Sequence, residues 1–573
     1  MKTAKVRFGF RVMLLAGVIL MSCNGHDTPP EKGKQGGSIK NHKYGGVVTL
    51  NEPTGFVSLY PPKAGDVGSM QVLVNVMEGL VQVRKEGGDV EPAIAESWNI
   101  LENATRFIFQ IRRGVYFHDD PCFPHGKGRE VDAHDIVYCL QQLCEPGPEN
   151  DNFWLVNGRI KGASSYYHSR EIGDGRVSSV EGLRAIDDYT VEIRLEEPFA
   201  PFLYMLSSMM TMIYPHEAVE MYGREHLDAH PVGTGPFKLK SAEPGEYVAL
   251  VRNENYWRRD VQGNQLPYLD GLMFRFDHNA NDMAELLKGT VDLTTVLGNT
   301  NVQKLFDGVN KDRFSMKRGE ILQTAFLGFQ HQDPLVKDVR IRRAISMAID
   351  RDRLANQVMT KLAEPAHGGL IPPFFGQYDA KGVTGIPFDP DKARTLLAEA
   401  GYPDGKGFPV IQVGFSSNMT TMATSVQAML QDNLGITIDP VVLPFQDLVK
   451  RCFGGTLPVF LMGWYADYPD PEAFLCLFYG ANVPDDPSMD SEINLCRYRN
   501  PIYDKLFEKA TAEINPQKRF ALYKQADQFL VDDVAALPLS HDIKFILYRS
   551  DLKNIGGNLM RMYSFTESYY EKE

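Results

Sequence analysis

The stretch Val459–Pro471, which reads V-F-L-M-G-W-Y-A-D-Y-P-D-P, is the part of the sequence that most constrains the fold. Val459–Met462 is a short apolar run of the kind that forms a buried strand, and we expect Gly463 to end it. Pro469 and Pro471 exclude a continuing helix or central strand directly afterwards. The chain must therefore leave a sheet here and turn, carrying aromatic rings and carboxylates at the exit of the strand.

The residues at this exit favour recognition of a positively charged group. The ring faces of Trp464, Tyr465 and Tyr468 attract a cation. Asp467 supplies the countercharge that a desolvated ammonium group needs. An alternative interpretation needs no ligand: the aspartates cap backbone N–H groups in a turn, and the aromatic rings belong to the core. The residues alone leave both interpretations open.

The segment G-W-Y-A-D-Y-P-D-P resembles one found in the peptide/nickel-type solute-binding proteins of ABC importers, the oligopeptide- and dipeptide-binding family. The resemblance implies that Asp467, three residues after Trp464, holds the α-ammonium group of a peptide. Some oligopeptide binders carry an arginine three residues before the tryptophan, where this chain has Leu461. Details of ligand choice therefore do not transfer.

Further motifs that resemble the family follow in family order over residues 45–550. They are E-P-A-I-A-E-S-W at 91–98, R-R-G-V-Y-F-H-D-D at 112–120, P-V-G-T-G-P-F-K at 231–238, R-N-E-N-Y-W at 252–257 and D-V-R-I-R-R-A-I-S-M-A-I-D-R at 338–351. We interpret the motif around Gly235 as a tight turn where backbone meets backbone at the floor of the ligand cleft, and we include Gly235 among the ligand-binding residues. Asp120 stands where the family usually has glycine, and an insertion, Pro121–Glu130, follows it.

The resemblance implies an α/β fold of two lobes, the periplasmic-binding-protein fold, with an extra α/β subdomain inserted in the first lobe. We expect a signal peptide at 1–22, a flexible tether at 23–43, first-lobe segments at 44–77, 206–324 and 536–573, the inserted subdomain at 78–205 and the second lobe at 325–535. Crossings near Thr324 and Ala535 predict two strands that join the lobes and allow them to close like a hinge.

Hydrophobic periodicity predicts the individual elements. We expect strands over 44–50, 106–112, 436–443 and 545–548, a hairpin over 180–195, and helices over 70–80, 131–143, 197–212, 338–354, 419–434, 503–514 and 516–532. The methionine-rich helix over 197–212 is interpreted as core rather than as a soft-metal site.

The N-terminus predicts export and lipidation. Basic residues between Lys2 and Arg11 precede the apolar run Val12–Met21, which is too short to span a bilayer. Leu20–Cys23 resembles a bacterial lipobox, which implies cleavage before Cys23 and lipidation of that cysteine. An ordinary secretory signal with an incidental cysteine is the alternative. We expect the protein on the periplasmic or cell-surface side of a bacterial membrane, anchored by lipid at Cys23.

The net charge of the chain argues against some classes of binding partner. The 573-residue chain has a formal net charge of −13, and loss of residues 1–22, which hold four basic and no acidic side chains, makes it −17. A negative chain of this kind argues against nucleic acid and against electrostatic attachment to anionic lipid. The expected partners are a peptide, the permease subunits of an ABC transporter, and the membrane through the lipid anchor. We expect a monomer.

Motifs for catalysis, metals and cofactors are missing from the sequence. It contains no G-x-S-x-G, H-E-x-x-H, phosphate loop, dinucleotide fingerprint or C-x-x-C. We predict no enzyme and no cofactor, with a hydrolase using Asp467 and Asp470 as the distant alternative. A group of histidines and aspartates suggests a metal site, but its spacing matches no motif with two ligands on one helical face, and the family resemblance implies turn and helix-cap roles: His118, Asp119, Asp120, His125, His134 and Asp135. Six cysteines besides Cys23 allow fifteen disulfide pairings: Cys122, Cys139, Cys144, Cys452, Cys476 and Cys496.

The predicted function is therefore a tethered binding protein that closes over an extended peptide and delivers it to a permease. Such binders use main-chain hydrogen bonds for register and wet pockets for side-chain tolerance. Alternatives with the same fold bind a metal chelate, an oligosaccharide or a signalling peptide. The sequence identifies no partner for the carboxylate of the ligand.

Overall fold

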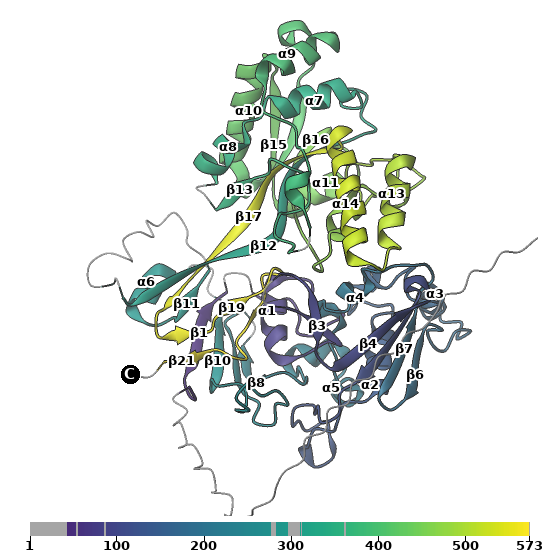
Figure 1. Ribbon diagram of the computed structural model, residues 1–573, viewed down its shortest axis with the longest axis vertical. Helices are drawn as coiled ribbons and strands as arrows, with labels where there is room; N and C mark the ends of the chain where they lie inside the picture. The colour runs from purple at the N-terminus through teal and green to yellow at the C-terminus, as the bar shows by residue number, and fades with distance from the viewer. Residues whose placement is uncertain are drawn as a thin grey trace, which may run out of the picture. The chain divides into compact units, whose positions relative to one another are not determined.

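A computed structural model describes residues 43–571 apart from 53–54, 85–86, 244, 277–281, 296–309, 311, 360–361 and 377. The predicted signal peptide, Cys23 and nearly all of the tether lie outside the described residues. Figure 1 shows how the described elements are arranged.

Eleven of the described strands form one mixed sheet (Figure 1). Strands β14 and β15 run parallel, whereas β16 is antiparallel to β12 and β12 is antiparallel to β17. In spatial order the strands are β15 (Ile438–Leu443), β14 (Ile411–Ser416), β16 (Val459–Tyr465), β12 (Phe314–Phe329), β17 (Ala536–Arg549), β11 (Leu293–Thr294), β1 (Val47–Asn51), β10 (Gly271–Arg275), β9 (Tyr247–Arg252) and β8 (Phe237–Glu243), with β13 (Ala363–Pro365) beside β17.

Strands β12 and β17 connect the two ends of this sheet. They pair from Phe314 with Arg549 to Gly328 with Ala536, and the register shifts between Glu320 and Phe326. In Figure 1 the pair runs from the group of β15 and β16 to the group of β1, β10 and β11. Strand β12 contains the expected crossing at Thr324, and β17 begins directly after the expected crossing at Ala535, while the lobe boundaries themselves stay a prediction.

Eight described α-helices lie within residues 325–535. Three of those before residue 435 contribute to a group of buried apolar side chains between residues 327 and 539, whereas those between residues 445 and 511 bury apolar side chains in the larger core. Gly435 ends α10 with a positive φ of 68°, as expected for a left-handed C-cap. These helices are α7 (Val339–Met347), α8 (Arg351–Arg353), α9 (Pro390–Glu399), α10 (Thr420–Leu434), α11 (Phe445–Phe453), α12 (Glu472–Leu475), α13 (Pro501–Thr511) and α14 (Pro516–Asp532).

The remaining elements include the four-stranded antiparallel sheet β4 (Ala95–Leu101), β5 (Arg106–Ile111), β7 (Thr190–Arg194) and β6 (Leu183–Asp187). This confirms the strand over 106–112 and the hairpin over 180–195. The helices are α1 (Val67–Val76), α2 (Ala133–Gln142), α3 (Ala163–Ile172), α4 (Phe202–Met205), α5 (His216–Tyr222) and α6 (Asp282–Lys288), and the short strands are β2 (Val81–Val83), β3 (Val90–Pro92), β18 (Leu552–Lys553), β19 (Gly556–Gly557), β20 (Tyr563–Ser564) and β21 (Tyr569–Tyr570).

The predicted helix over 197–212 is wrong. Only α4 and a 3-10 turn at Met209–Thr211 form there. Ser208 has extended backbone angles, and its hydroxyl accepts from the Met210 N–H, so a local side-chain bond competes with the helix. The methionines of this segment are buried in the core, as expected.

Several predicted ends also need correction. Strand β16 does not stop at Gly463, because Gly463, Trp464 and Tyr465 continue the ladder with β12. The strand over 545–548 is the last part of the much longer β17. Helix α1 begins at Val67, where the Asp66 side chain accepts from the Ser69 N–H, and ends at Val76 rather than at Leu80.

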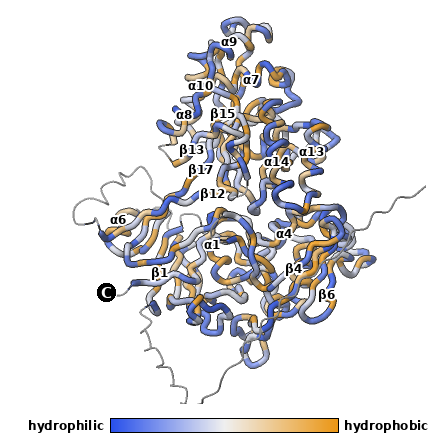
Figure 2. Tube along the Cα trace, in the orientation of Figure 1, coloured by the Kyte–Doolittle hydropathy of each residue, from blue (hydrophilic) through white to orange (hydrophobic). Residues whose placement is uncertain are grey.

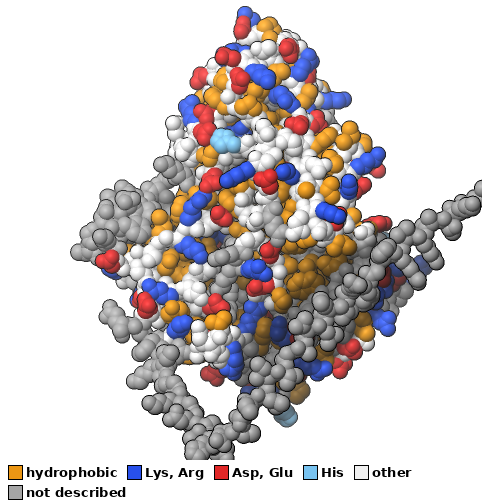
Figure 3. Space-filling model, in the orientation of Figure 1, with side chains coloured by type: hydrophobic (Ala, Val, Ile, Leu, Met, Phe, Trp, Pro, Cys, Tyr) orange, Lys and Arg blue, Asp and Glu red, His pale blue; other side chains and the backbone are white. Residues whose placement is uncertain are grey.

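In the described part of the chain, no helix has the length and apolar character that crossing a membrane requires. Figure 2 shows hydrophobic stretches interrupted by hydrophilic residues along the described chain. On the face in Figure 3, acidic and basic side chains are interspersed rather than gathered by sign. The negative net charge is therefore not concentrated on this face.

Candidate ligand-binding site

A cavity of about 770 Å³ is lined by residues from four separate regions of the chain. They are residues 70–112, residues 207–266, the turn Asp467–Pro469, and the C-terminal segment 556–567. Pockets of this size suit small-molecule ligands. Six methionines make much of its wall apolar and adaptable: Met70, Met77, Met209, Met212, Met560 and Met562.

Strand β16 places Asp467, two residues beyond its end, in the lining of this cavity. Tyr465 is the last residue paired with β12, opposite Gln323, and the Ala466 N–H then donates to the Leu322 carbonyl at 2.9 Å. Pro469 follows at once, so the chain turns away after Tyr468. The carboxylate of Asp467 thus lies at the exit of the strand, as the sequence predicts.

Asp467 has no hydrogen-bond or ion-pair partner among the described residues, although its side chain is half-buried. Burial, and secondarily the charge of Glu472, raises the pKa of Asp467 to about 7. A desolvated carboxylate without a partner is costly when ionised, and a bound cation offsets that cost. The arrangement therefore suits a ligand that brings a positive charge.

Glu472, by contrast, has partners on both sides. Arg159 places Nη2 3.8 Å from Glu472 Oε1, and the Tyr468 hydroxyl donates to the Glu472 carboxylate. Burial raises the pKa of Glu472, with Arg159 and the Tyr468 hydroxyl opposing the shift. Tyr468 lines the cavity beside Asp467 and is held by this bond.

Trp464 and Tyr465 support the turn. Neither is among the described residues that line the cavity. The Trp464 indole Nε1 donates to the Ala473 carbonyl at 2.7 Å. The Tyr465 hydroxyl accepts from Arg561 Nη1 at 3.0 Å, and its side chain is 42% exposed. Of the four residues predicted around the cation, the structure brings Asp467 and Tyr468 into the cavity.

Gly235 lies where two backbones meet, as predicted. Its N–H donates to the Val76 carbonyl at 2.9 Å, and a Cβ at Gly235 would lie 2.6 Å from the Val76 carbonyl carbon. Its carbonyl accepts from Asn253 Nδ2 at 3.0 Å and faces Nε2 of the buried His118 at 2.9 Å. Its neighbour Pro236 lines the cavity, so Gly235 shapes the floor from behind.

Sequence analysis missed the buried carboxylate Glu78 on the cavity wall. It accepts from the Tyr256 hydroxyl at 2.9 Å and the Trp257 indole at 2.8 Å. It also accepts from the Thr234 hydroxyl at 3.0 Å and pairs with Arg258 at 3.4 Å. The motifs at 231–238 and 252–257 contain these partners, but no local spacing connects them to residue 78.

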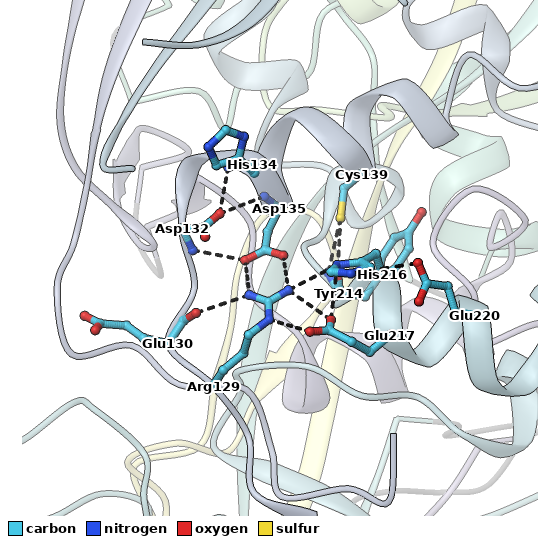
Figure 4. A network of polar contacts seen from close by, with 10 residues as sticks. All are labelled: Arg129, Glu130, Asp132, His134, Asp135, Cys139, Tyr214, His216, Glu217 and Glu220. Carbon is cyan, nitrogen blue, oxygen red and sulfur yellow. Dashed lines mark hydrogen bonds and ion pairs between the residues drawn. The ribbon is translucent and has the colours of Figure 1, made fainter. Parts of the chain in front are cut away.

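Four residues of the suspected metal cluster, His118, Asp119, Asp120 and Asp135, have side-chain partners, and no group of three metal-ligating side chains occurs in the described chain. Figure 4 shows Arg129 between two carboxylates: Asp135 accepts at 2.6 and 2.7 Å, and Glu217 at 2.6 and 2.9 Å. Asp119 pairs with Lys127, and Asp120 accepts from Tyr222. The six described cysteines are all free thiols.

Comparison with known proteins decides the family. Residues 89–485 match the sequence profile of bacterial extracellular solute-binding proteins, family 5. The chain belongs to this family. As members of family 5 are binding proteins rather than enzymes, the hydrolase alternative is excluded.

Relatives of this family 5 protein have different ligands in their names. It is 30% identical to heme-binding protein A of Haemophilus influenzae, over 82% of each chain. It is 28% identical to probable di/tripeptide-binding protein 5 of Pseudomonas aeruginosa, over 89% of this chain and 93% of that one.

The predicted periplasmic-binding-protein fold is confirmed by solved structures. DppA from Helicobacter pylori in complex with the peptide STSA superposes with a TM-score of 0.73 at 24% identity, covering 93% of this chain and 99% of that one. HbpA2 from Haemophilus parasuis gives 0.74 at 23% identity, covering 92% and 100%.

Proposed function

We propose that this family 5 protein captures a short peptide with a free amino terminus and delivers it to the permease of an ABC importer. The observation that carries the proposal is the half-buried carboxylate of Asp467, which faces the cavity without a partner among the described residues. A peptide α-ammonium supplies the missing charge. The methionine-lined wall accommodates varied apolar side chains.

We further propose that the protein acts outside the cytoplasmic membrane, tethered by lipid at Cys23, and that its two lobes close over the peptide. Support for closure comes from the cavity itself, because Asp467–Pro469 belong to the predicted second lobe and the other lining residues to the first. The peptide-binding names of several relatives support the ligand class.

A heme-like metal chelate is the second candidate, because heme-binding protein A is a relative at 30% identity. The two candidates differ at Asp467, since the carboxylate attracts a peptide ammonium group but repels the propionates of a porphyrin. Titration with hemin, followed in the Soret band, tests this candidate. Tight binding that Asp467→Asn leaves unchanged or strengthens would favour the chelate over the peptide.

The peptide function is tested by a thermodynamic double-mutant cycle that combines a substitution of Asp467 with a modification of the peptide amino terminus. Calorimetry measures the binding of trileucine and of N-acetyl-trileucine to the wild type and to Asp467→Asn, which keeps size but removes charge. Removing one member of a desolvated charge pair costs about 2–5 kcal/mol, or roughly 30-fold to several thousand-fold in affinity.

We expect each single change to weaken binding by this amount and the second change to cost little further. If the two losses simply add, Asp467 does not contact the amino terminus. If neither trileucine nor a mixed library of di- to tetrapeptides binds the wild type, the peptide function is wrong.

A further inference from the structure

Most of the charged side chains that line the cavity already have partners. Arg258 pairs with Glu78 at 3.4 Å, and Arg84 with Glu91 at 3.6 Å. Asn554 donates to Glu567 at 3.1 Å. The Arg258–Glu78 and Arg84–Glu91 pairs offer little net charge to a ligand, because bringing another ion to a neutralised pair leaves one charge uncompensated.

Arg112 is the exception on the basic side. It is half-buried, its Nε donates only a long 3.3 Å bond to the Ala93 carbonyl, and no described carboxylate lies within ion-pair distance. Arg259 also lacks a carboxylate partner in the described chain, but it is exposed and donates to the Gly263 carbonyl. A partly desolvated guanidinium attracts an anion more strongly than an exposed one.

The Trp257 indole positions Arg112. The guanidinium carbon of Arg112 lies 4.7 Å from the centroid of the Trp257 rings, as does that of Arg258. The Trp257 indole N–H is fixed by its bond to Glu78. A ring oriented in this way holds the planar guanidinium in one place, so less side-chain freedom is lost when a carboxylate binds.

Arg112 and Trp257 also mark a boundary. They are the residues shared by the ligand cavity and a second, more polar cavity of about 680 Å³. The second cavity is lined by Arg113, Glu96, Asp187 and Thr190 among others. A group bound at Arg112 therefore lies where the first cavity adjoins the second.

We propose that Arg112 binds the carboxylate of the ligand, so that a bound peptide lies with its amino terminus at Asp467 and its carboxyl terminus at the junction of the two cavities. This inference rests on the peptide function proposed above. Asp467 and Arg112 then match the two ends of a zwitterion, with a half-buried carboxylate for the ammonium group and a half-buried guanidinium for the carboxylate. An arginine can bind a carboxylate through two parallel N–H···O hydrogen bonds, which fix the orientation of the carboxylate as well as pair its charge.

The experiment compares trileucine with trileucine amide, which lacks the terminal carboxylate. Calorimetry measures both ligands against the wild type, Arg112→Gln and the matched control Arg113→Gln. Arg113 is adjacent, stacks 3.7 Å from the Tyr189 ring centroid and lines only the second cavity of the two. Charged hydrogen bonds are worth about 1.5–3 kcal/mol, so amidation should weaken wild-type binding roughly 10- to 150-fold.

We expect Arg112→Gln to weaken trileucine by a similar factor and to abolish most of the difference between acid and amide. Arg113→Gln should keep the wild-type difference. If Arg112→Gln folds poorly, Arg112→Lys replaces it in the experiment. Lysine keeps the charge but lacks the planar guanidinium, so the affinities for trileucine and its amide should differ less than in the wild type.

The inference would be overturned if every Arg112 variant kept the full wild-type difference in affinity between trileucine and trileucine amide. Loss of that difference in affinity in Arg113→Gln would also overturn it. Trileucine that binds through Asp467 but is indifferent to amidation would overturn it while leaving the peptide function intact. Failure of any peptide to bind would instead contradict the peptide function itself.

Discussion

Asp470 and Arg519 form an ion pair of 3.2 Å whose side chains are 0% and 3% exposed. The second oxygen of Asp470 caps the following turn, accepting from the Glu472 N–H at 2.9 Å. Asp467, three residues earlier, has no such partner among the described residues. The two aspartates of one short turn therefore have different roles: one holds the structure and one is left for the ligand.

Asp470→Asn should destabilise the protein without changing the affinity of the folded fraction. Breaking a buried ion pair leaves an uncompensated charge, here on Arg519, and the expected loss is about 3 kcal/mol in the free energy of unfolding. Urea unfolding followed by tryptophan fluorescence measures it. Asp467→Asn is the control and should show the opposite pattern, with weak binding and undiminished stability. Equal stability of Asp470→Asn and wild type would contradict this division of roles.

Peptide affinity should rise as the pH is raised from about 5.5 to 7.5. Because burial raises the pKa of Asp467 to about 7, the carboxylate is largely protonated at pH 5.5 and must ionise to hold an ammonium group. Binding near pH 6.5 should therefore release a proton. Above pH 8 affinity should fall again, as the peptide amine, with a pKa near 8, loses its charge.

Calorimetry at several pH values, in two buffers of different ionisation enthalpy, measures both the affinity and the released proton. Asp467→Asn should show no rise between pH 5.5 and 7.5. In the ligand-free protein the raised pKa has the reverse effect: stability falls as the pH rises from about 4 to 7, because the folded state then binds more protons than the unfolded state. A wild-type affinity that is flat over this range would contradict the assignment.

Ligand binding should make the molecule more compact. Residues lining one cavity come from both predicted lobes, and β12 and β17 join those lobes with register shifts near Thr324. A peptide that contacts both lobes favours the closed state. Small-angle scattering with saturating trileucine should show a smaller radius of gyration for the wild type. Asp467→Asn at the same peptide concentration should show no change, and an unchanged wild-type radius with verified saturation would contradict the hinge.

The mature protein should begin at a lipidated Cys23. The basic N-terminus, the apolar run and the order Leu20–Cys23 motivate this expectation. Mass spectrometry of membrane-extracted protein should find an acylated N-terminal cysteine, and Cys23→Ser should move the protein to the soluble fraction. An unmodified N-terminus at another residue would contradict lipidation.

Much of the local structure followed from the sequence, because it depends on short-range signals. The C-cap Gly435 and the alternating strand of residues 106–111 both act within a few residues of their own position. The errors arose where distant pairing or side-chain competition decided the outcome. Gly463 stays in a strand because β12 lies beside it, and Ser208 interrupts a segment whose composition favours a helix.

The candidate site divides in the same way. The sequence by itself determined the family, the strand exit and the carboxylate of Asp467 there, because these are encoded in consecutive residues. Only the tertiary structure decided that Asp467 is left without a described partner while Asp470 is paired, and that Arg112 lines the same cavity. Whether a charged side chain is paired, and which residues share a cavity, depends on segments that are far apart in the chain, and only folding brings those segments together.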